Sequence, residues 1–484
     1  VELELLSTGR KVFHNLHYRW MGKNHETIWI NCRGRVLSDP EDGSPRYLVG
    51  CINEIGAKQK ADNVSGLLGE YSLKIFYESR SPKLPQGFLL RIGIDDFKNI
   101  NESHGNEYGD YILRRTAQCI EENIGSEQSL FHIVADEFAV VDFSGGSVQQ
   151  AEDLFHEIKK SIYAFIEQNQ YKAVYTVSGG IVKNGDVDNS FENAMKLSEF
   201  ALSEAKERGK NSCYVFEEEE YEDYLKSRTL LRQLHHAVNN GFEGFEAYFQ
   251  PLVNAANGEL TGAETLLRFH LPEGGMVSPG EFIPILEESG LIIPVGRWVL
   301  RQALDACREW QKILPEFKVN VNLSYVQVLK SRVLTDVRRI VDEFGVKPSS
   351  VCIELTESGY LEENERFDKV WNGLKEYGVL LALDDFGTGY SNLRCLSDLK
   401  PAYIKIDRSF TLKALNREYE YRLLNHIVEM SHSLGLHVCV EGIETEGELT
   451  KAKQTEPDYI QGFLFGKPCS RAEFTQKFFT KQAG

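Results

Sequence analysis

The feature that most constrains the fold is a series of short apolar runs separated by helical stretches over residues 242–484. Each run has the length of a β-strand, and eight follow one another: 246–253, 262–268, 318–324, 351–356, 380–385, 403–407, 437–441 and 459–465. Apolar strands that alternate with helices are typical of a parallel sheet covered on both faces. Eight such units in one segment predict a (β/α)₈-type barrel, for which about 250 residues is the usual length.

Polar side chains mark the end of every one of these runs. They are Gln250; Glu264 with Arg268; Asn322; Glu354 with Glu357; Asp384 with Asp385; Lys405 with Asp407; Glu441 with Glu444; and Gln461. Solvated strand ends explain any one of these positions but explain the whole set poorly. Because the C-terminal ends of barrel strands meet at one mouth, we expect these side chains to form a single site.

The residue types at this mouth indicate metal-assisted chemistry. Carboxylates and an asparagine, without histidine or cysteine, form a set of hard oxygen ligands that favours Mg²⁺ or Mn²⁺ over Zn²⁺. The adjacent Asp384 and Asp385 can serve two ions if one carboxylate bridges, and paired ions are the usual device for cleaving a phosphodiester. Lys405 is suited to hold and polarise the attacking water, and Arg268 is suited to grip phosphate oxygens.

The sequence motifs around these residues make residues 242–484 similar to an EAL domain, the family of cyclic di-GMP phosphodiesterases. The matching segments are Tyr248–Pro251, Gly262–Arg268, Val321–Ser324, Glu354–Ser358, Asp384–Ser391, Lys405–Phe410, Glu441–Thr445 and Gln461–Phe463. One position departs from the signature, since Glu-Ala-Leu reads Glu264-Thr265-Leu266. Strand parity places Thr265 on the side that faces the helices, so we expect little effect on catalysis.

This resemblance implies hydrolysis of cyclic di-GMP to linear 5′-pGpG, with two Mg²⁺ or Mn²⁺ ions per site. It implies metal ligation by Glu264, Asn322, Glu354, Asp384 and Asp385. It implies catalytic roles for Lys405 and Glu441, which activate water, and for Glu264. Substrate-binding residues by the same resemblance are Gln250, Arg268, Glu357, Asp407, Glu444 and Gln461.

The family's architecture adds three further expectations. Its first barrel strand is antiparallel. Glu357 should brace the loop after Asp385, which in the family couples the site to a dimer interface. We therefore expect a homodimer with the Phe386–Leu396 segment close to the interface. Two alternatives remain open for the barrel, namely a catalytically weak cyclic di-GMP receptor and an unrelated metal-dependent barrel enzyme such as a lyase.

Residues 57–216 have the pattern of an α/β domain. Strand-like runs occur at 88–95, 130–133, 138–143 and 173–182, and helical patterns occur near 107–122, 149–168 and 191–207. This region resembles a GGDEF domain, which makes cyclic di-GMP from two GTP molecules. The resemblance is carried by Asp62–Leu67, Phe97–Asn101, Gly109-Asp110 and Ala205–Asn211.

The signature of this middle domain is degenerate. Gly-Gly-Asp-Glu-Phe reads Val134-Ala135-Asp136-Glu137-Phe138, and Gly93 stands where the family carries a metal-binding aspartate. Because two glycines are lost, nucleotide phosphates can no longer approach the backbone as closely. We therefore expect no synthesis. GTP binding is still expected through Phe97, Lys98, Asn101, Asp110, Asp136, Lys206 and Lys210, with a purely structural domain as the alternative.

The N-terminal region, residues 1–56, alternates like paired strands around 18–37 and 47–55, with a turn-rich segment at 38–45 between them. This resembles the C-terminal part of a PAS sensor domain, with an isolated β-hairpin as the alternative. At the other end of the middle domain, an acidic run at 217–220 opens a predicted linker helix over 217–241, which leads into the EAL domain at 242–484.

The net charge of −18 argues against general binding to duplex DNA or anionic lipid. A phosphodiester substrate must therefore be attracted locally, by metal ions and a few placed cations. The nine scattered cysteines form no zinc or redox spacing, and no apolar run approaches the roughly 20 residues of a membrane span. We expect a bacterial cytoplasmic protein and, since the chain starts at Val1, a soluble portion of a longer one.

Overall fold

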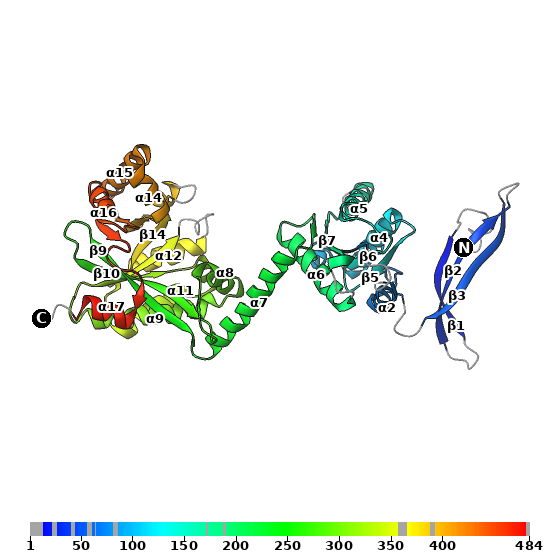
Figure 1. Ribbon diagram of the computed structural model, residues 1–484, viewed down its shortest axis with the longest axis horizontal. Helices are drawn as coiled ribbons and strands as arrows, with labels where there is room; N and C mark the ends of the chain where they lie inside the picture. Colours follow the sequence, from blue (N-terminus) through cyan, green and yellow to red (C-terminus); the bar gives the residue numbers. More distant parts are fainter. Residues whose placement is uncertain are drawn as a thin grey trace. The chain divides into compact units, whose positions relative to one another are not determined.

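The computed structural model describes residues 13–21, 27–39, 44–55, 61–62, 64–80, 86–170, 173–186, 190–356, 365–387 and 393–480. The chain divides into two compact units, Val1–Asp223 and Tyr224–Gly484. The division falls inside helix α7 (Glu218–Asn239), whose bounds lie close to those of the linker helix predicted over 217–241. Figure 1 shows the elements of each unit in sequence colours.

The second unit is a closed barrel, as the sequence predicts. Its strands run in the order β10-β12-β13-β14-β15-β16-β17-β9, and an additional β9–β10 pairing closes the sheet. Strand β9 is antiparallel to both of its neighbours in the barrel, while the other neighbouring pairs are parallel. The strands are β9 Phe245–Asn254, β10 Leu260–His270, β12 Lys318–Asn322, β13 Val351–Thr356, β14 Leu380–Phe386, β15 Tyr403–Ile406, β16 His437–Val440 and β17 Tyr459–Gln461.

Helices cover the outside of this barrel (Figure 1), and the side chains that they bury are mostly apolar. In α11 the buried residues Val333, Val337, Ile340 and Val341 follow the helical repeat of 3.6 residues. The helices are α8 Pro279–Ser289, α9 Ile292–Trp310, α10 Tyr325–Lys330, α11 Val333–Phe344, α12 Glu365–Tyr377, α13 Leu393–Leu399, α14 Arg408–Asn416, α15 Glu418–Ser433, α16 Glu446–Lys453 and α17 Arg471–Phe478. Two short strands, β11 Met276–Val277 and β18 Cys469–Ser470, and the 3₁₀ helix Pro348–Ser350 complete the unit.

The middle sheet of the first unit has the strand order β5-β6-β4-β7-β8. Alternate residues of β4 enter two separate cores: Phe88, Leu90 and Ile92 pack with α4 and α5, whereas Leu89 packs with α2 and α6. The elements are α2 Glu70–Arg80, β4 Phe88–Ile94, α3 Phe97–His104, α4 Asn106–Asn123, β5 Gln128–His132, β6 Glu137–Asp142, α5 Val148–Gln168, β7 Val177–Lys183, the 3₁₀ helix Asn184–Asp186, α6 Phe191–Glu207 and β8 Cys213–Val215.

A separate antiparallel sheet of three strands precedes the middle sheet, in the order β1-β2-β3. Its strands are β1 Phe13–Met21, β2 Thr27–Ser38 and β3 Pro45–Ile55. The run predicted over 18–37 is therefore two paired strands rather than one, and its break lies outside the described residues. The predicted turn at 38–45 is described only at its ends, where the Asp39 amide donates to the Ser44 carbonyl over 2.8 Å. The PAS assignment stays a prediction.

Seven of the nine cysteines, Cys32, Cys119, Cys213, Cys307, Cys352, Cys439 and Cys469, are free, and all of these except Cys32 and Cys213 are buried. Among the described residues, no helix combines the length and the apolar character that a membrane crossing requires.

Candidate active site

The barrel mouth holds a lysine whose ammonium group contacts four carboxylates. Lys405, near the end of β15, is 2% exposed. Its Nζ lies 2.8 Å from Glu441 and 3.0 Å from Glu264. It lies 3.1 Å from Glu354 and 3.4 Å from Asp384. These acids come from different strands or strand ends, so the closed sheet itself assembles the cluster that the sequence predicts.

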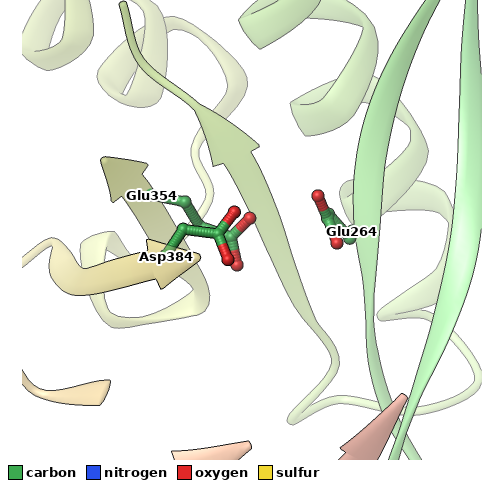
Figure 2. Close-up of side chains that lie close together, drawn as sticks. All are labelled: Glu264, Glu354 and Asp384. Carbon is green, nitrogen blue, oxygen red and sulfur yellow. The ribbon is translucent and has the colours of Figure 1, made fainter. Parts of the chain in front are cut away.

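Three of the acids stand close enough to share an ion. Oxygen atoms of Glu264, Glu354 and Asp384 lie within 4.8 Å of one another, and all three side chains are buried. Figure 2 shows the carboxylates of Glu354 and Asp384 side by side, with Glu264 facing them from another strand.

Asp384 and Asp385 are neighbours in the sequence, and a regular strand would point them to opposite faces. The β14–β15 register shifts between Leu383 and Phe386. Asp385 also takes a left-handed backbone conformation, with φ at 57°. A bulge of this kind re-aims a side chain, and here it places Asp385 in electrostatic range of both Asp384 and Asp407.

Amide side chains hold the Glu264 carboxylate in place. Asn322 donates to its Oε1 over 3.0 Å, and Gln461 donates to its Oε2 over 2.7 Å. Gln461 also donates to Gln250 over 3.2 Å, and Gln250 donates to the Gly466 carbonyl over 3.4 Å. Asn322 is itself exposed, so its amide lies on the open side of the cluster.

Sequence reasoning missed one member of this cluster, Asn320. Its side chain is 7% exposed and donates to Glu354 Oε1 over 2.7 Å. Glu354 is fully buried, so this bond supports a carboxylate that water cannot reach. The sequence spacing could have identified Asn320, because it lies two residues before Asn322 on β12 and therefore shares its face.

Burial and mutual repulsion shift the ionisation of these acids. Burial raises the pKa of Glu354 well above its usual value and that of Glu441 to about 8. Burial and the Asp384 charge raise the pKa of Asp385 to about 6. Burial also opposes ionisation of Glu264, but Lys405 and Gln461 outweigh it and lower the pKa of that carboxyl. These raised pKa values are what is expected where buried carboxylates outnumber the single lysine that can neutralise them.

The donor set fits divalent cations. Four carboxylates surround one ammonium, so three negative charges lack a basic partner when all four acids are ionised. Buried charge of this size is costly unless it is compensated, and clustered carboxylate and amide oxygens are what Mg²⁺ and Mn²⁺ prefer. The buried group of Glu264, Glu354 and Asp384 is consistent with the metal site of an EAL domain.

The outer residues of the predicted site have partners within the protein. Arg268 donates to the Leu267 carbonyl over 2.9 Å, with its guanidinium 5.5 Å from the centre of the Tyr248 ring. Asp407 caps α14 by accepting from the Ser409 amide over 2.7 Å. Glu444 pairs with Arg408 over 2.5 Å. Glu357 lies outside the described residues.

A pocket of about 550 Å³ lies beside Asn322 and Arg268. Its walls come from β10, the start of α10 and helices α8 and α9, and they are largely apolar. Thr265 lines this pocket on the side of the helices, as strand parity predicts. The Thr265 hydroxyl is buried without a hydrogen-bond partner.

In the middle domain, the expected guanine-reading residues lie on α3 and α4. The side chain of Asn101 packs against Gly109, where a Cβ atom would come within 1.8 Å of its Oδ1. A glycine is therefore required at position 109, and it brings Asn101 next to the helical turn that carries Asp110. Phe97 packs partly into the core below these residues.

The signature turn and the lysines of this domain differ in how they are held. Ala135 has a φ of 51°, in the left-handed region that favours glycine, and Val134 before it is 56% exposed. Lys98 is exposed and pairs with Glu102 over 3.7 Å, and Lys210 pairs with Asp96 over 2.8 Å. Asp136 is partly buried at this turn.

Comparison with known proteins matches both domains. Residues 231–468 match the EAL domain, and residues 72–212 match the family described as diguanylate cyclase, GGDEF domain. The chain is 29% identical over 381 residues to the bifunctional diguanylate cyclase/cyclic di-GMP phosphodiesterase MucR of Pseudomonas aeruginosa, which covers 78% of this chain and 55% of that protein. It is 28% identical over 455 residues to the cyclic di-GMP phosphodiesterase PdeR of Escherichia coli, covering 94% and 67%.

A solved structure of the EAL enzyme Bd1971 in its cAMP-bound form is 27% identical, with a TM-score of 0.50, over 62% of this chain and 80% of that chain. The chain spans about half the length of curated relatives such as a signalling protein of Caulobacter vibrioides, of which it covers 50%. Because a GGDEF match and an EAL match follow one another along the sequence, the chain belongs to the tandem GGDEF–EAL family.

Proposed function

We propose that the barrel is a phosphodiesterase that hydrolyses cyclic di-GMP to linear 5′-pGpG. The observation that carries this proposal is Lys405, almost fully buried and in contact with four carboxylates at the barrel mouth. Burying so many charges is expensive for folding, and such clusters are concentrated at catalytic sites. The names of MucR and PdeR support cyclic di-GMP as the substrate.

Glu264, Asn322, Glu354, Asp384 and Asp385 would hold two divalent ions, which when bound neutralise charge on the phosphate and make water a better nucleophile. Lys405 and Glu441, which are in direct contact at 2.8 Å, would both bond the attacking water, Lys405 as donor and Glu441 as acceptor. Water oxygen bonds to phosphorus and the P–O3′ bond breaks, so the product carries a 5′-phosphate and the 3′-oxygen takes a proton.

The surroundings of the cluster suit the rest of the substrate. Arg268 stands at the edge of the mouth, where its guanidinium can donate two bonds to a non-bridging phosphate pair. The pocket of about 550 Å³ beside it is largely apolar, and planar bases bind well in apolar pockets with a few polar groups. We assign one guanine of the substrate to this pocket.

The test is incubation of the purified chain with cyclic di-GMP and Mg²⁺ or Mn²⁺, with the linear dinucleotide measured by chromatography. Chelation of the ions should abolish turnover, and Ca²⁺ should support it poorly because its coordination is larger and looser. Lys405→Ala should be inactive, whereas the exposed Lys413→Ala on α14 should behave as wild type. Tight binding of cyclic di-GMP without any product would favour the receptor alternative instead.

We propose in addition that the middle domain binds GTP and regulates the barrel without making cyclic di-GMP. The loss of both signature glycines and of the carboxylate at position 93 argues against synthesis, while Asn101, Asp110 and three lysines remain for one nucleotide.

A ligand shifts an equilibrium only by its differential affinity for two states, so we expect GTP to change the rate of hydrolysis by at most about 5- to 150-fold. Labelled GTP should give no cyclic di-GMP, and added GTP should change hydrolysis in wild type but not in the Asn101→Ala/Asp110→Ala variant.

A homodimer completes the proposal, on the family resemblance alone. Residues 388–392 of the predicted interface segment lie outside the described part of the chain. Light scattering should give twice the monomer mass, and a fully active monomer at high concentration would remove this expectation.

A further inference from the structure

The GGDEF fold implies a divalent ion next to the signature turn, and the residues of this chain do not fit one. The relevant surface is the face of β4 that packs against α6. Arg91 and Gly93 lie on this face, and Gly93 is paired with Glu137 on one side and Ser178 on the other. The position expected to carry a metal-binding carboxylate therefore carries only a hydrogen atom.

A lysine ammonium occupies the space in front of Gly93. A Cβ atom built on Gly93 would lie 2.9 Å from Lys206 Nζ and 3.2 Å from the side chain of Leu202. Lys98 and Lys210 each have a carboxylate partner. No described carboxylate lies within ion-pair distance of Lys206, so its ammonium hydrogens are available to a ligand even though Asp136 is near enough to feel its charge.

The two acids of the signature are not available as a pair of metal ligands. Arg91 holds the Glu137 carboxylate with its Nε at 2.7 Å and its Nη2 at 2.6 Å, and the arginine side chain is only 7% exposed. That leaves Asp136. Burial raises its pKa, and the nearby Lys206 charge acts in the opposite direction.

The two signature acids each have a basic side chain nearby without an ion, although Arg91 also lies 3.7 Å from the exposed Glu199. Glu137 is neutralised by Arg91, and the single charge of Asp136 is matched by that of Lys206. A divalent ion would find one carboxylate where it needs several oxygen ligands, and it would be repelled by an ammonium group close by. The same ammonium group attracts an anionic phosphate, because Lys206 can donate charge-assisted hydrogen bonds to it.

We propose that the middle domain binds the phosphates of a guanine nucleotide without a divalent ion, with the Lys206 ammonium in the place of the metal. This inference rests on the proposed GTP binding and specifies its chemistry. It assigns to Lys206 the neutralisation of phosphate charge, and it removes Asp136 from the role of a metal ligand.

The experiment measures equilibrium binding of labelled GTP to the full chain, once with excess Mg²⁺ and once with EDTA. The affinity should be similar in the two conditions. Lys206→Gln should weaken binding roughly 10- to 100-fold in both, as expected for the loss of a charged hydrogen-bond donor. Lys206→Arg should retain most of the affinity. The exposed Lys196→Gln on the same helix is the matched control and should bind as wild type.

A second variant restores the carboxylate that position 93 lacks. Gly93→Asp introduces a carboxylate beside Lys206, so it should weaken binding in EDTA and make binding depend on Mg²⁺. The Asn101→Ala/Asp110→Ala variant gives the background from other sites, and circular dichroism checks that each variant is folded. Wild-type binding that disappears in EDTA, or is unaffected by Lys206→Gln, overturns this inference alone. Absence of GTP binding in both conditions overturns the proposed regulation with it, and neither result touches cyclic di-GMP hydrolysis, which is assayed separately.

Discussion

The barrel mouth and the signature turn of the middle domain both combine a lysine with acidic side chains. The two sites differ in how many acids surround the lysine. Lys405 is outnumbered by four carboxylates. Lys206 stands near one unpaired acid, Asp136, because position 93 is a glycine and Glu137 is already bound to Arg91. The first site has more carboxylates than basic groups close to its lysine, and the second does not. We propose that this difference in the number of carboxylates around the lysine decides which ligand each site holds.

The two sites also differ in what holds their residues. Glu264, Glu354 and Lys405 lie on strands of a closed sheet, and hydrogen bonds from Asn320, Asn322 and Gln461 fix the acids further. The middle site depends instead on a turn in which Ala135 adopts a φ of 51° and on long lysine side chains. Sites on rigid elements are more precise than sites on loops, which suits chemistry at the barrel and binding at the middle domain.

The largest effect should come from removing a carboxylate at the barrel mouth. Loss of a side chain that only supports a metal ligand typically costs about 10- to 100-fold, so Glu264→Ala should lower kcat by at least about 100-fold. GTP binding to the middle domain should be unchanged. Steady-state kinetics and labelled-GTP binding on the same preparation check both halves. Full activity of Glu264→Ala in the presence of EDTA would falsify the metal mechanism.

Asn320 should have the next largest effect. Asn320→Ala leaves Glu354 buried without its 2.7 Å hydrogen bond, so the affinity for Mn²⁺ should fall roughly 10- to 100-fold. Calorimetry with Mn²⁺ and the dependence of rate on Mn²⁺ concentration measure this directly, and excess Mn²⁺ should restore most of the rate. The exposed Asn257→Ala on the β9–β10 turn is the control. Unchanged Mn²⁺ affinity would show that Asn320 serves packing only.

These two predictions mark where sequence reasoning succeeded and where it stopped. Lys405 and the acids could be found because parallel strands of a barrel end at one mouth, so position along the chain implies position in space. Asn320 sits inside a strand, where a polar residue has no obvious partner until the β12–β13 pairing is known. Lys206 and Gly93 lie more than a hundred positions apart, and only the packing of α6 on β4 brings them together. The second aspartate at the mouth was predicted, but the bulge that aims it was not.

A smaller effect should separate the two sites by their response to metal alone. An ion that binds only the folded state stabilises it by about 2.7 kcal/mol when present at 100 times its dissociation constant. Added Mn²⁺ should therefore slow hydrogen exchange of β12 and β15 in the barrel and leave β4 of the middle domain unchanged. Exchange detected by mass spectrometry resolves both segments in one experiment. Protection of β4 by Mn²⁺ without nucleotide would contradict the contrast between the sites.

The smallest effect should come from Thr265, the residue that departs from the barrel signature. This prediction tests whether the effect of such a departure depends on the direction in which the side chain points. Thr265 faces the helices, 2% exposed, and its hydroxyl has no hydrogen-bond partner. Thr265→Val keeps the shape and removes that hydroxyl, which should raise the free energy of unfolding by about 1–3 kcal/mol, the cost of an unsatisfied buried polar group. The kcat should change little, because Glu264 on the opposite face keeps its partners. Denaturant unfolding and kinetics on the same variant measure the two quantities, with the exposed Thr450→Val on α16 as control. A large fall in kcat for Thr265→Val, as distinct from a change in KM through the pocket that Thr265 lines, would mean that the outer face of β10 reaches the chemistry.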